Sequence, residues 1–203
     1  MKIICVGRNY AEHAKELNNP VNEHPVIFLK PETAQLQARQ PFFMPDFSND
    51  VHHEAEIVVK ICRLGKNIQE KFAHKYYDEL SIGIDFTARD LQSSLKSKGL
   101  PWELAKAFDA SAPVGQFVNK SELGPLDNLQ FSLTNNGAKV QQGTTADMIF
   151  KIDYIISFVS QYFTLKKGDL IFTGTPKGVA PVKKGDQLEG FIGERHLLTV
   201  KVR

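Results

Sequence analysis

The sequence predicts an α+β fold in which many short strands and few helices form β-rich mixed sheets. Most apolar segments are short, rich in β-branched residues and bounded by turn-forming residues, which is typical of strands. Helix signals are few, and strands and helices do not alternate regularly as they do in Rossmann and TIM-barrel folds. The 203 residues contain no low-complexity linker, so we expect a single domain over residues 1–203.

The N-terminal half is expected to hold four strands and two helices. Apolar segments predict strands over residues 2–6, 26–29, 55–61 and 80–86. Asn9 is a favoured helix cap and predicts a helix over residues 10–17. Asn67, with Glu70 three residues later, resembles a capping box, which predicts a second helix that ends near Leu80.

The C-terminal half begins with a mixed stretch, residues 87–109, that is interrupted at Gly99-Leu100-Pro101. The apolar residues of segment 152–163 recur at helical spacing and predict a longer helix. Asn135-Asn136-Gly137 predicts a hairpin turn. Six further apolar segments predict strands, over residues 117–118, 129–133, 139–142, 170–173, 187–192 and 196–202.

Composition and charge argue against several classes of protein. The 25 basic and 23 acidic residues leave a formal net charge of +2, without the basic cluster that nucleic-acid binding needs. The longest apolar run, residues 154–159, is too short to span a bilayer, and the first residues lack the apolar core of a signal peptide. Cys5 and Cys62 lie in apolar runs, as free thiols do in a reducing compartment. We therefore expect a cytoplasmic protein with neither nucleic-acid nor membrane partners.

The strongest chemical signal is a set of acidic residues on two predicted strands. Glu54 and Glu56 lie two residues apart, so on a strand their side chains project from the same face and repel each other unless a cation or a proton lies between them. Asp85 ends another apolar strand, where a bare charge is costly. Three carboxylates without cysteine ligands suit Mg²⁺, and also Mn²⁺ or Ca²⁺. Spacing alone leaves an alternative open, in which Glu54 and Glu56 lie on an exposed face and pair with lysines.

Several segments of the chain resemble the fumarylacetoacetate hydrolase family. The segments shared with the family at large are His53-Glu54-Ala55-Glu56, Gly83-Ile84-Asp85-Phe86-Thr87-Ala88-Arg89-Asp90 and Gly174-Thr175-Pro176-Lys177-Gly178-Val179. Those that resemble its small acylpyruvase branch are Val6-Gly7-Arg8-Asn9-Tyr10-Ala11-Glu12-His13 and Gly99-Leu100-Pro101-Trp102-Glu103-Leu104-Ala105-Lys106. They occur in the family's order and cover essentially the whole chain, which makes the resemblance specific although each segment alone is weak evidence.

The resemblance implies a role for each polar residue of these segments. Glu54, Glu56 and Asp85 would bind Mg²⁺, which a small 2-oxo acid substrate would chelate through its carboxylate and keto oxygens. The family pattern places four further polar groups around the substrate, at Arg8, Arg89, Gln92 and Thr175. Lys106 would stabilise the enolate that forms as the bond breaks. Without the resemblance, Arg89 reads as a salt-bridge partner of Asp90 or another acid, Lys106 reads as a surface lysine, and the single Trp102 serves packing.

His13 and Glu16 lie three residues apart on the first predicted helix, so their side chains can touch. A glutamate that orients a histidine is a usual arrangement for activating water. The resemblance implies that this helix, within residues 1–20, closes over the substrate as a lid. Without the resemblance, the two residues read as an exposed ion pair.

The resemblance implies a Mg²⁺-dependent hydrolase that cleaves a C–C bond in 3-acylpyruvates and releases pyruvate and a carboxylic acid. Oxaloacetate decarboxylation or tautomerisation, or isomerisation of an unsaturated 2-oxo diacid such as 2-hydroxyhepta-2,4-diene-1,7-dioate, would use the same site and form the alternative. A binding protein without catalysis is disfavoured, because every residue of the expected site is present. The resemblance also suggests a homodimer.

Overall fold

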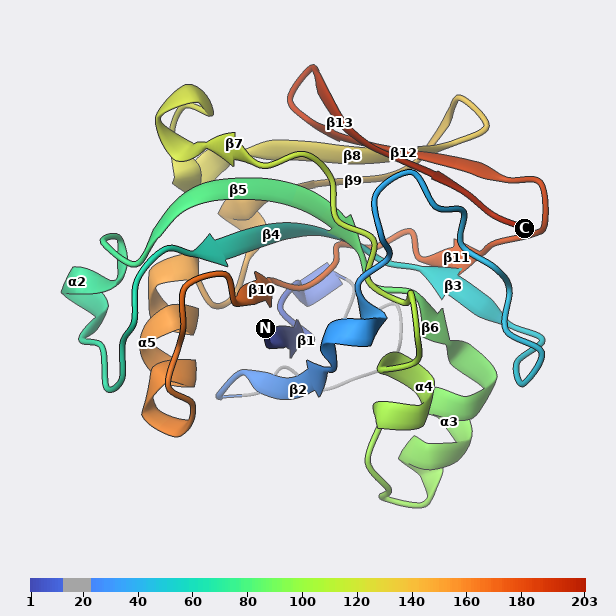
Figure 1. Ribbon diagram of the computed structural model, residues 1–203, viewed down its shortest axis with the longest axis horizontal. Coiled ribbons are helices and arrows are strands. Elements are labelled where there is room, and N and C mark those ends of the chain that lie inside the picture. Colours follow the sequence, from blue (N-terminus) through green and yellow to red (C-terminus); the bar gives the residue numbers. More distant parts are fainter. Residues whose placement is uncertain (13–22) are drawn as a thin grey trace.

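The computed structural model describes residues 1–12 and 23–203, and three β-sheets dominate it (Figure 1). The largest is a six-stranded sheet with the order β2-β1-β10-β4-β5-β7. Its strands are β1 (Ile3–Gly7), β2 (Val26–Lys30), β4 (Ala55–Ile61), β5 (Tyr77–Ile84), β7 (Val118–Asn119) and β10 (Leu170–Phe172). Strands β1 and β10 are parallel and the other neighbours are antiparallel, so this is a mixed sheet, as predicted.

Two smaller antiparallel sheets complete the β structure. A four-stranded sheet has the order β13-β12-β8-β9 and lies above β4 and β5 in Figure 1. Its strands are β8 (Gln130–Asn135), β9 (Ala138–Thr144), β12 (Gln187–Ile192) and β13 (Arg195–Lys201). A three-stranded sheet joins β11 (Ala180–Pro181), β3 (Val51–His53) and β6 (Thr87–Ala88), and it lies beside the ends of β4 and β5.

Helices are few and short in the described chain. They are α2 (Glu70–Ala73), α3 (Arg89–Ser97), α4 (Glu103–Lys106) and α5 (Ile152–Tyr162), with four 3₁₀ turns over Glu32–Ala34, Lys120–Glu122, Leu126–Asn128 and Thr145–Asp147. None of the helices in the described ranges is long and apolar enough to cross a membrane. The abundance of strands over helices confirms the predicted α+β class.

The central strands β1, β10 and β4 of the six-stranded sheet are buried on both faces, which explains why they read as continuous apolar runs. In β4, Ile57 packs in the larger apolar core and the next residue, Val58, packs in a smaller one on the opposite face. The larger core lies against the four-stranded sheet, which contributes Leu188 from β12. Gly190 of β12 permits the close approach of the two sheets, because a Cβ atom there would lie 2.9 Å from Ile82 of β5.

The predicted helix over residues 67–80 is wrong. Only α2 is helical in this stretch, and β5 already begins at Tyr77. Asn67 does not cap a helix, because it adopts a left-handed backbone with φ of 50° and its N–H donates to the carbonyl of Ser160. The next N–H, that of Ile68, donates to Ser160 Oγ at 2.8 Å. Contacts with a distant helix, together with pairing of β5 to β4, override the local helix signal.

The predicted hairpin turn is confirmed. Asn136 and Gly137 both have positive φ, at 51° and 81°, and they connect β8 to β9. The mixed stretch 87–109 contains β6, α3 and α4, with a break at Gly99, whose φ is 65°. The three-stranded sheet was not predicted, because strands of two or three residues leave no period in the sequence. Residues 13–17 of the predicted first helix lie outside the described residues.

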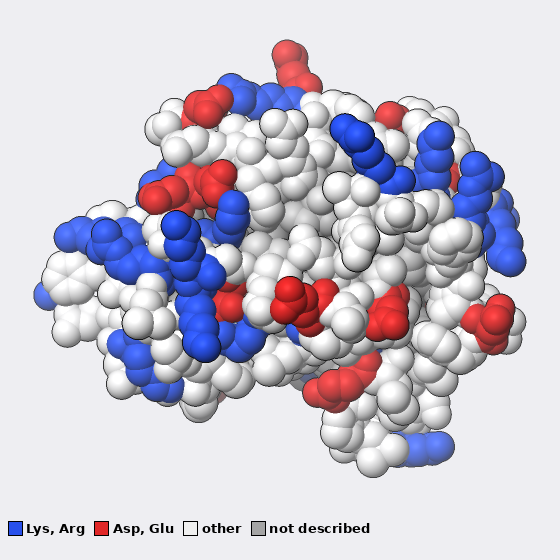
Figure 2. Space-filling view, viewed as in Figure 1, with Lys and Arg blue, Asp and Glu red and all other residues white. Residues whose placement is uncertain are grey.

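Acidic and basic side chains are mixed over the face of the molecule shown in Figure 2. Basic side chains gather at the end where α2 lies, with acidic ones beside them, and a second basic group lies at the opposite end. Much of the middle of this face carries neither charge. This distribution agrees with the near balance of 25 basic and 23 acidic residues in the chain. The expectation that nucleic acid is not a partner stays a prediction.

Candidate metal and substrate site

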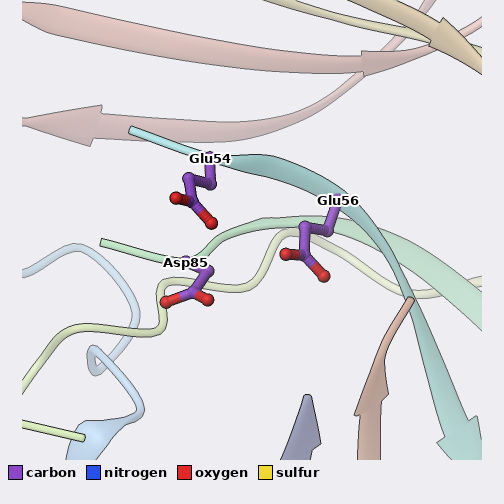
Figure 3. A group of neighbouring side chains, drawn as sticks. All are labelled: Glu54, Glu56 and Asp85. Carbon is purple, nitrogen blue, oxygen red and sulfur yellow. The ribbon is translucent and has the colours of Figure 1, made fainter. Parts of the chain in front are cut away.

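Two adjacent strands bring the predicted carboxylates together. Glu56 is in β4, Glu54 immediately precedes this strand, and Asp85 immediately follows β5. Because β4 and β5 are antiparallel with Ala55 opposite Ile84, the start of one strand lies beside the end of the other. The N–H of Asp85 donates to the carbonyl of Glu54 at 2.8 Å and ties the two ends together. Figure 3 shows the three side chains extending into the space between them, where one oxygen of each lies within 4.8 Å of the others.

All three carboxylates are buried, with exposed fractions of 5% for Glu54, 2% for Glu56 and 0% for Asp85. Burial, and then the charges of Asp85 and Glu54, hold the pKa of Glu56 well above its usual range. The N–H of Gly174 opposes this shift by donating to Glu56 Oε2 at 2.6 Å. Among the described residues, none donates a hydrogen bond to the buried Asp85 Oδ1. A buried cluster that offers only oxygen ligands fits a hard divalent cation.

Lys106 is buried within this cluster and is not a surface lysine. Its Nζ donates hydrogen bonds to Glu54 Oε2 at 2.7 Å, to Asp85 Oδ2 at 2.8 Å and to Thr87 Oγ1 at 2.6 Å. Burial lowers the pKa of Lys106, but the charges of Asp85 and Glu54 outweigh it, and the pKa is raised overall. The ammonium therefore stays protonated at neutral pH and supplies a fixed positive charge beside the carboxylates.

Arg89 begins α3 and points back toward the carboxylates. Its Nη2 forms an ion pair with Glu54 Oε1, and its Nη1 donates to Gln92 Oε1. The alternative partner, Asp90, instead accepts hydrogen bonds from Ser48 Oγ at 2.7 Å and from the N–H of Asn49 at 3.1 Å. Arg89 and Gln92 are one helical turn apart, so the start of α3 presents both side chains together.

Eight of the predicted site residues line one small pocket, with a volume of about 150 Å³. They are Arg8, Glu54, Glu56, Asp85, Arg89, Gln92, Lys106 and Thr175. The pocket wall also includes Val6, Gly7, Phe28, Ser93, Lys96 and Trp102. Trp102, expected to serve packing, thus faces the site, with the guanidinium carbon of Arg8 5.8 Å from its ring centre. His13 and Glu16 lie outside the described residues.

Two buried residues that support the site were not predicted. Gln141 of β9 accepts a hydrogen bond from the N–H of Ala55 at 2.9 Å and donates to Thr175 Oγ1 at 2.9 Å, so it joins the start of β4 to the pocket wall. Lys30, the last residue of β2, lies 2.7 Å from Asp85 Oδ1. A lysine at the end of an apolar run was the only signal for Lys30, and Gln141 carried none.

The sequence profile described as "Fumarylacetoacetate (FAA) hydrolase C-terminal" matches residues 2–202. The chain belongs to this family. Among similar proteins, "Oxaloacetate tautomerase FAHD1, mitochondrial" of Homo sapiens is 46% identical over 200 residues, which cover 98% of this chain and 90% of that protein. "Oxaloacetate tautomerase YcgM" of Escherichia coli strain K12 is 45% identical over 202 residues, or 99% of this chain and 92% of that one.

Solved structures of the fumarylacetoacetate hydrolase family share the fold of this chain. One is the fumarylpyruvate hydrolase of Pseudomonas aeruginosa, in complex with Mn²⁺ and pyruvate. It is 35% identical, covers 100% of this chain and 89% of its own, and superposes with a TM-score of 0.93. The mixed, strand-rich architecture is therefore that of the family. The two tautomerases and the fumarylpyruvate hydrolase that resemble this chain are all enzymes.

Proposed function

We propose that the protein is a divalent-metal-dependent oxaloacetate tautomerase, which interconverts the keto and enol forms of this 2-oxo acid. The observation that carries the proposal is the Lys106 ammonium, buried between Glu54 and Asp85 and facing a small pocket. A fixed positive charge there stabilises negative charge that develops on a keto oxygen during enolisation. The similarity to oxaloacetate tautomerases supports this alternative more directly than it supports the hydrolase expected first from sequence.

The charges of the pocket favour a short, doubly negative substrate. Its wall carries four cations, Arg8, Arg89, Lys96 and Lys106, against three carboxylates. A bound divalent ion would make the wall clearly positive, which attracts a dianion such as oxaloacetate. The volume of about 150 Å³ also suits a small acid better than one with a long acyl chain.

Glu54, Glu56 and Asp85 would hold the metal ion. Their oxygen-only set suits Mg²⁺ and Mn²⁺, and a similar structure contains Mn²⁺. When bound, the ion would act as a Lewis acid that makes the carbon next to the keto group more acidic and offsets the negative charge of the enolate. Mg²⁺ remains the proposed physiological ion, with Mn²⁺ or Ca²⁺ as substitutes.

The side chains of the pocket divide the remaining work. The guanidinium of Arg89 can bind a substrate carboxylate, with Gln92 holding it in place. Lys106 Nζ can turn one of its protons from a carboxylate toward the keto oxygen of the substrate, since two of its three acceptors are ligand carboxylates. His13, oriented by Glu16, is the proposed base that takes the carbon-bound proton, and the enol forms when the enolate oxygen takes up a proton in turn.

Hydrolysis of acylpyruvates is the second candidate. The specific observation in its favour is the 35% identity to a fumarylpyruvate hydrolase whose structure holds pyruvate. Both reactions would place the same 2-oxo acid group against Lys106 and Arg89. They differ in whether His13 activates a water or removes a proton from carbon.

Three assays on the purified protein with Mg²⁺ or Mn²⁺ separate the candidates. Loss of enol absorbance from freshly dissolved oxaloacetate reports tautomerisation, pyruvate release from oxaloacetate reports decarboxylation, and pyruvate release from acetylpyruvate reports hydrolysis. We expect the first reaction to have the highest kcat/KM. Faster turnover of acetylpyruvate would overturn the ranking, and absence of all three reactions would overturn the proposal.

The homodimer, the cytoplasmic location and the lid role of the first helix also stay predictions. The molar mass of the protein in solution, measured by light scattering, tests the first. Several proteins similar to this chain carry "mitochondrial" in their names, so the location requires a direct test by imaging or fractionation.

A further inference from the structure

Lys30 is a second buried lysine at the carboxylate cluster. Its side chain is 0% exposed, which is rare for a lysine unless it is paired. Its Nζ lies 2.7 Å from Asp85 Oδ1, an atom that accepts no hydrogen bond from the described residues, so the contact is one of charge. Unlike Lys106, it does not line the substrate pocket.

The hydrogen bonds of Lys30 all go to the segment that carries Lys106. Its Nζ donates to the carbonyl of Lys106, to Ser111 Oγ at 2.9 Å and to the carbonyl of Ser111 at 3.3 Å. Ser111 Oγ in turn donates to the carbonyl of Lys106 at 3.0 Å. An ammonium has three protons, so these acceptors use all of them and leave none for a substrate.

The two buried lysines therefore differ in what they can do. Two of the three acceptors of Lys106 are the carboxylates of Glu54 and Asp85, which would turn toward a bound ion. Two N–H groups of Lys106 would then be able to donate hydrogen bonds to the substrate. The acceptors of Lys30 are two main-chain carbonyls and a buried hydroxyl. None of them is a carboxylate of the cluster, so we expect these hydrogen bonds to persist when an ion or a substrate binds. Both lysines stay charged, but Lys30 keeps its hydrogen bonds to the protein, whereas Lys106 can redirect hydrogen bonds from the carboxylates to a substrate.

We propose that Lys30 is a positioning residue for the reaction. It holds the main chain at Lys106 so that the Lys106 ammonium faces the keto oxygen, and its charge offsets that of Asp85 while the ion is absent. The effect on turnover rests on the proposed function, whereas the effect on ion and anion binding does not. If Lys30 had only a structural role, its replacement would change the stability of the protein and leave kcat unchanged.

The test replaces Lys30 by methionine, which keeps the long apolar stem and removes the ammonium. We expect kcat for oxaloacetate tautomerisation to fall by about tenfold to a hundredfold with KM changed by less than about threefold, since an interaction made in the transition state is lost. Mn²⁺ affinity, measured by calorimetry without substrate, should not fall, because a positive charge near the ion has been removed.

Two further variants keep the test decisive. Ser111→Ala removes one hydrogen-bond partner of Lys30 and keeps the charge of Lys30. This variant should lower kcat below the wild-type value, but less than Lys30→Met does. If Lys30→Met does not fold, the fall of kcat in Ser111→Ala is the test. The control is Lys2→Met, because Lys2 also pairs with a buried carboxylate, that of Asp169, but away from the pocket. This change should lower the melting temperature and leave kcat unchanged.

Wild-type kcat in folded Lys30→Met would overturn the proposal, and so would a loss of Mn²⁺ affinity as large as that of Asp85→Ala. If the wild-type protein catalyses none of the three reactions, the proposed function fails, and the affinity for oxalate then tests the role of Lys30. Oxalate mimics a planar enolate, and its affinity for the Mn²⁺-loaded protein should be at least about tenfold weaker in Lys30→Met. Unchanged oxalate affinity would count against the positioning role.

Discussion

Replacing Lys106 by methionine removes the ammonium that the proposed reaction depends on most. The side chain donates three short hydrogen bonds, at 2.6 to 2.8 Å, and in the reacting complex one of these protons would serve the enolate oxygen. Removal of one donor to a developing oxyanion costs about 10²–10³-fold in kcat, equal to about 2.7–4 kcal/mol. Oxaloacetate tautomerisation and acylpyruvate hydrolysis should both fall by this factor, because both place negative charge on the same oxygen.

The same change should destabilise the metal-free protein. Removal of one partner from a buried ion pair costs about 3–5 kcal/mol, and the lower end applies here because Arg89 still pairs with Glu54 and Lys30 with Asp85. For a chain of this length, about 3 kcal/mol lowers the melting temperature by roughly 6–12 °C. Saturating Mn²⁺ should raise the melting temperature of Lys106→Met more than that of wild type, since no ammonium competes for Glu54 Oε2 and Asp85 Oδ2.

Kinetic assays on both substrates and melting curves with and without Mn²⁺ check these values. Lys60→Met is the matched control, because Lys60 pairs with Glu79 at 2.7 Å on the surface, where both side chains are more than a third exposed. It should change neither kcat nor the response to Mn²⁺. A loss in kcat of less than threefold for Lys106→Met, with the protein folded and Mn²⁺ bound, would refute the role of this ammonium.

Three other predictions address the metal, the carboxylates and the proposed base. Treatment with a chelator should abolish turnover, and Mg²⁺ or Mn²⁺ should restore it; full activity in a verified metal-free sample would contradict the metal site. The raised pKa of Glu56 means that the folded, metal-free protein keeps a proton that the unfolded chain releases above about pH 4.3. The melting temperature of the metal-free protein should therefore fall as the pH rises from this value, and it should fall less in Glu56→Gln. An equal fall in the two proteins would contradict the raised pKa of Glu56. His13→Ala should lower acylpyruvate hydrolysis by about 10²–10⁴-fold and oxaloacetate decarboxylation much less; an unchanged rate of hydrolysis would leave the histidine without a catalytic role.

The sequence alone predicted the fold class and the three carboxylates that meet in one buried cluster. Strand periodicity places Glu54 and Glu56 on one face, and the apolar run before Asp85 marks the end of a buried strand. These signals are local, because they depend on side-chain direction within one element. The resemblance to the family then pointed to Arg8, Arg89, Gln92, Lys106 and Thr175, and all of these residues line the same pocket.

Only the tertiary structure decided which signals would prevail and which distant groups would meet. The capping box at Asn67 fails because Asn67 has a left-handed backbone and because Ser160, far along the chain, accepts hydrogen bonds from the N–H groups of Asn67 and Ile68. Lys30 is bound to Asp85 and to the segment of Lys106 by pairing of separate strands, which no local pattern encodes. The energy of a buried charge depends on its neighbours in space, so the burial and partners of Lys30 follow from the packed sheet and not from its place in the sequence.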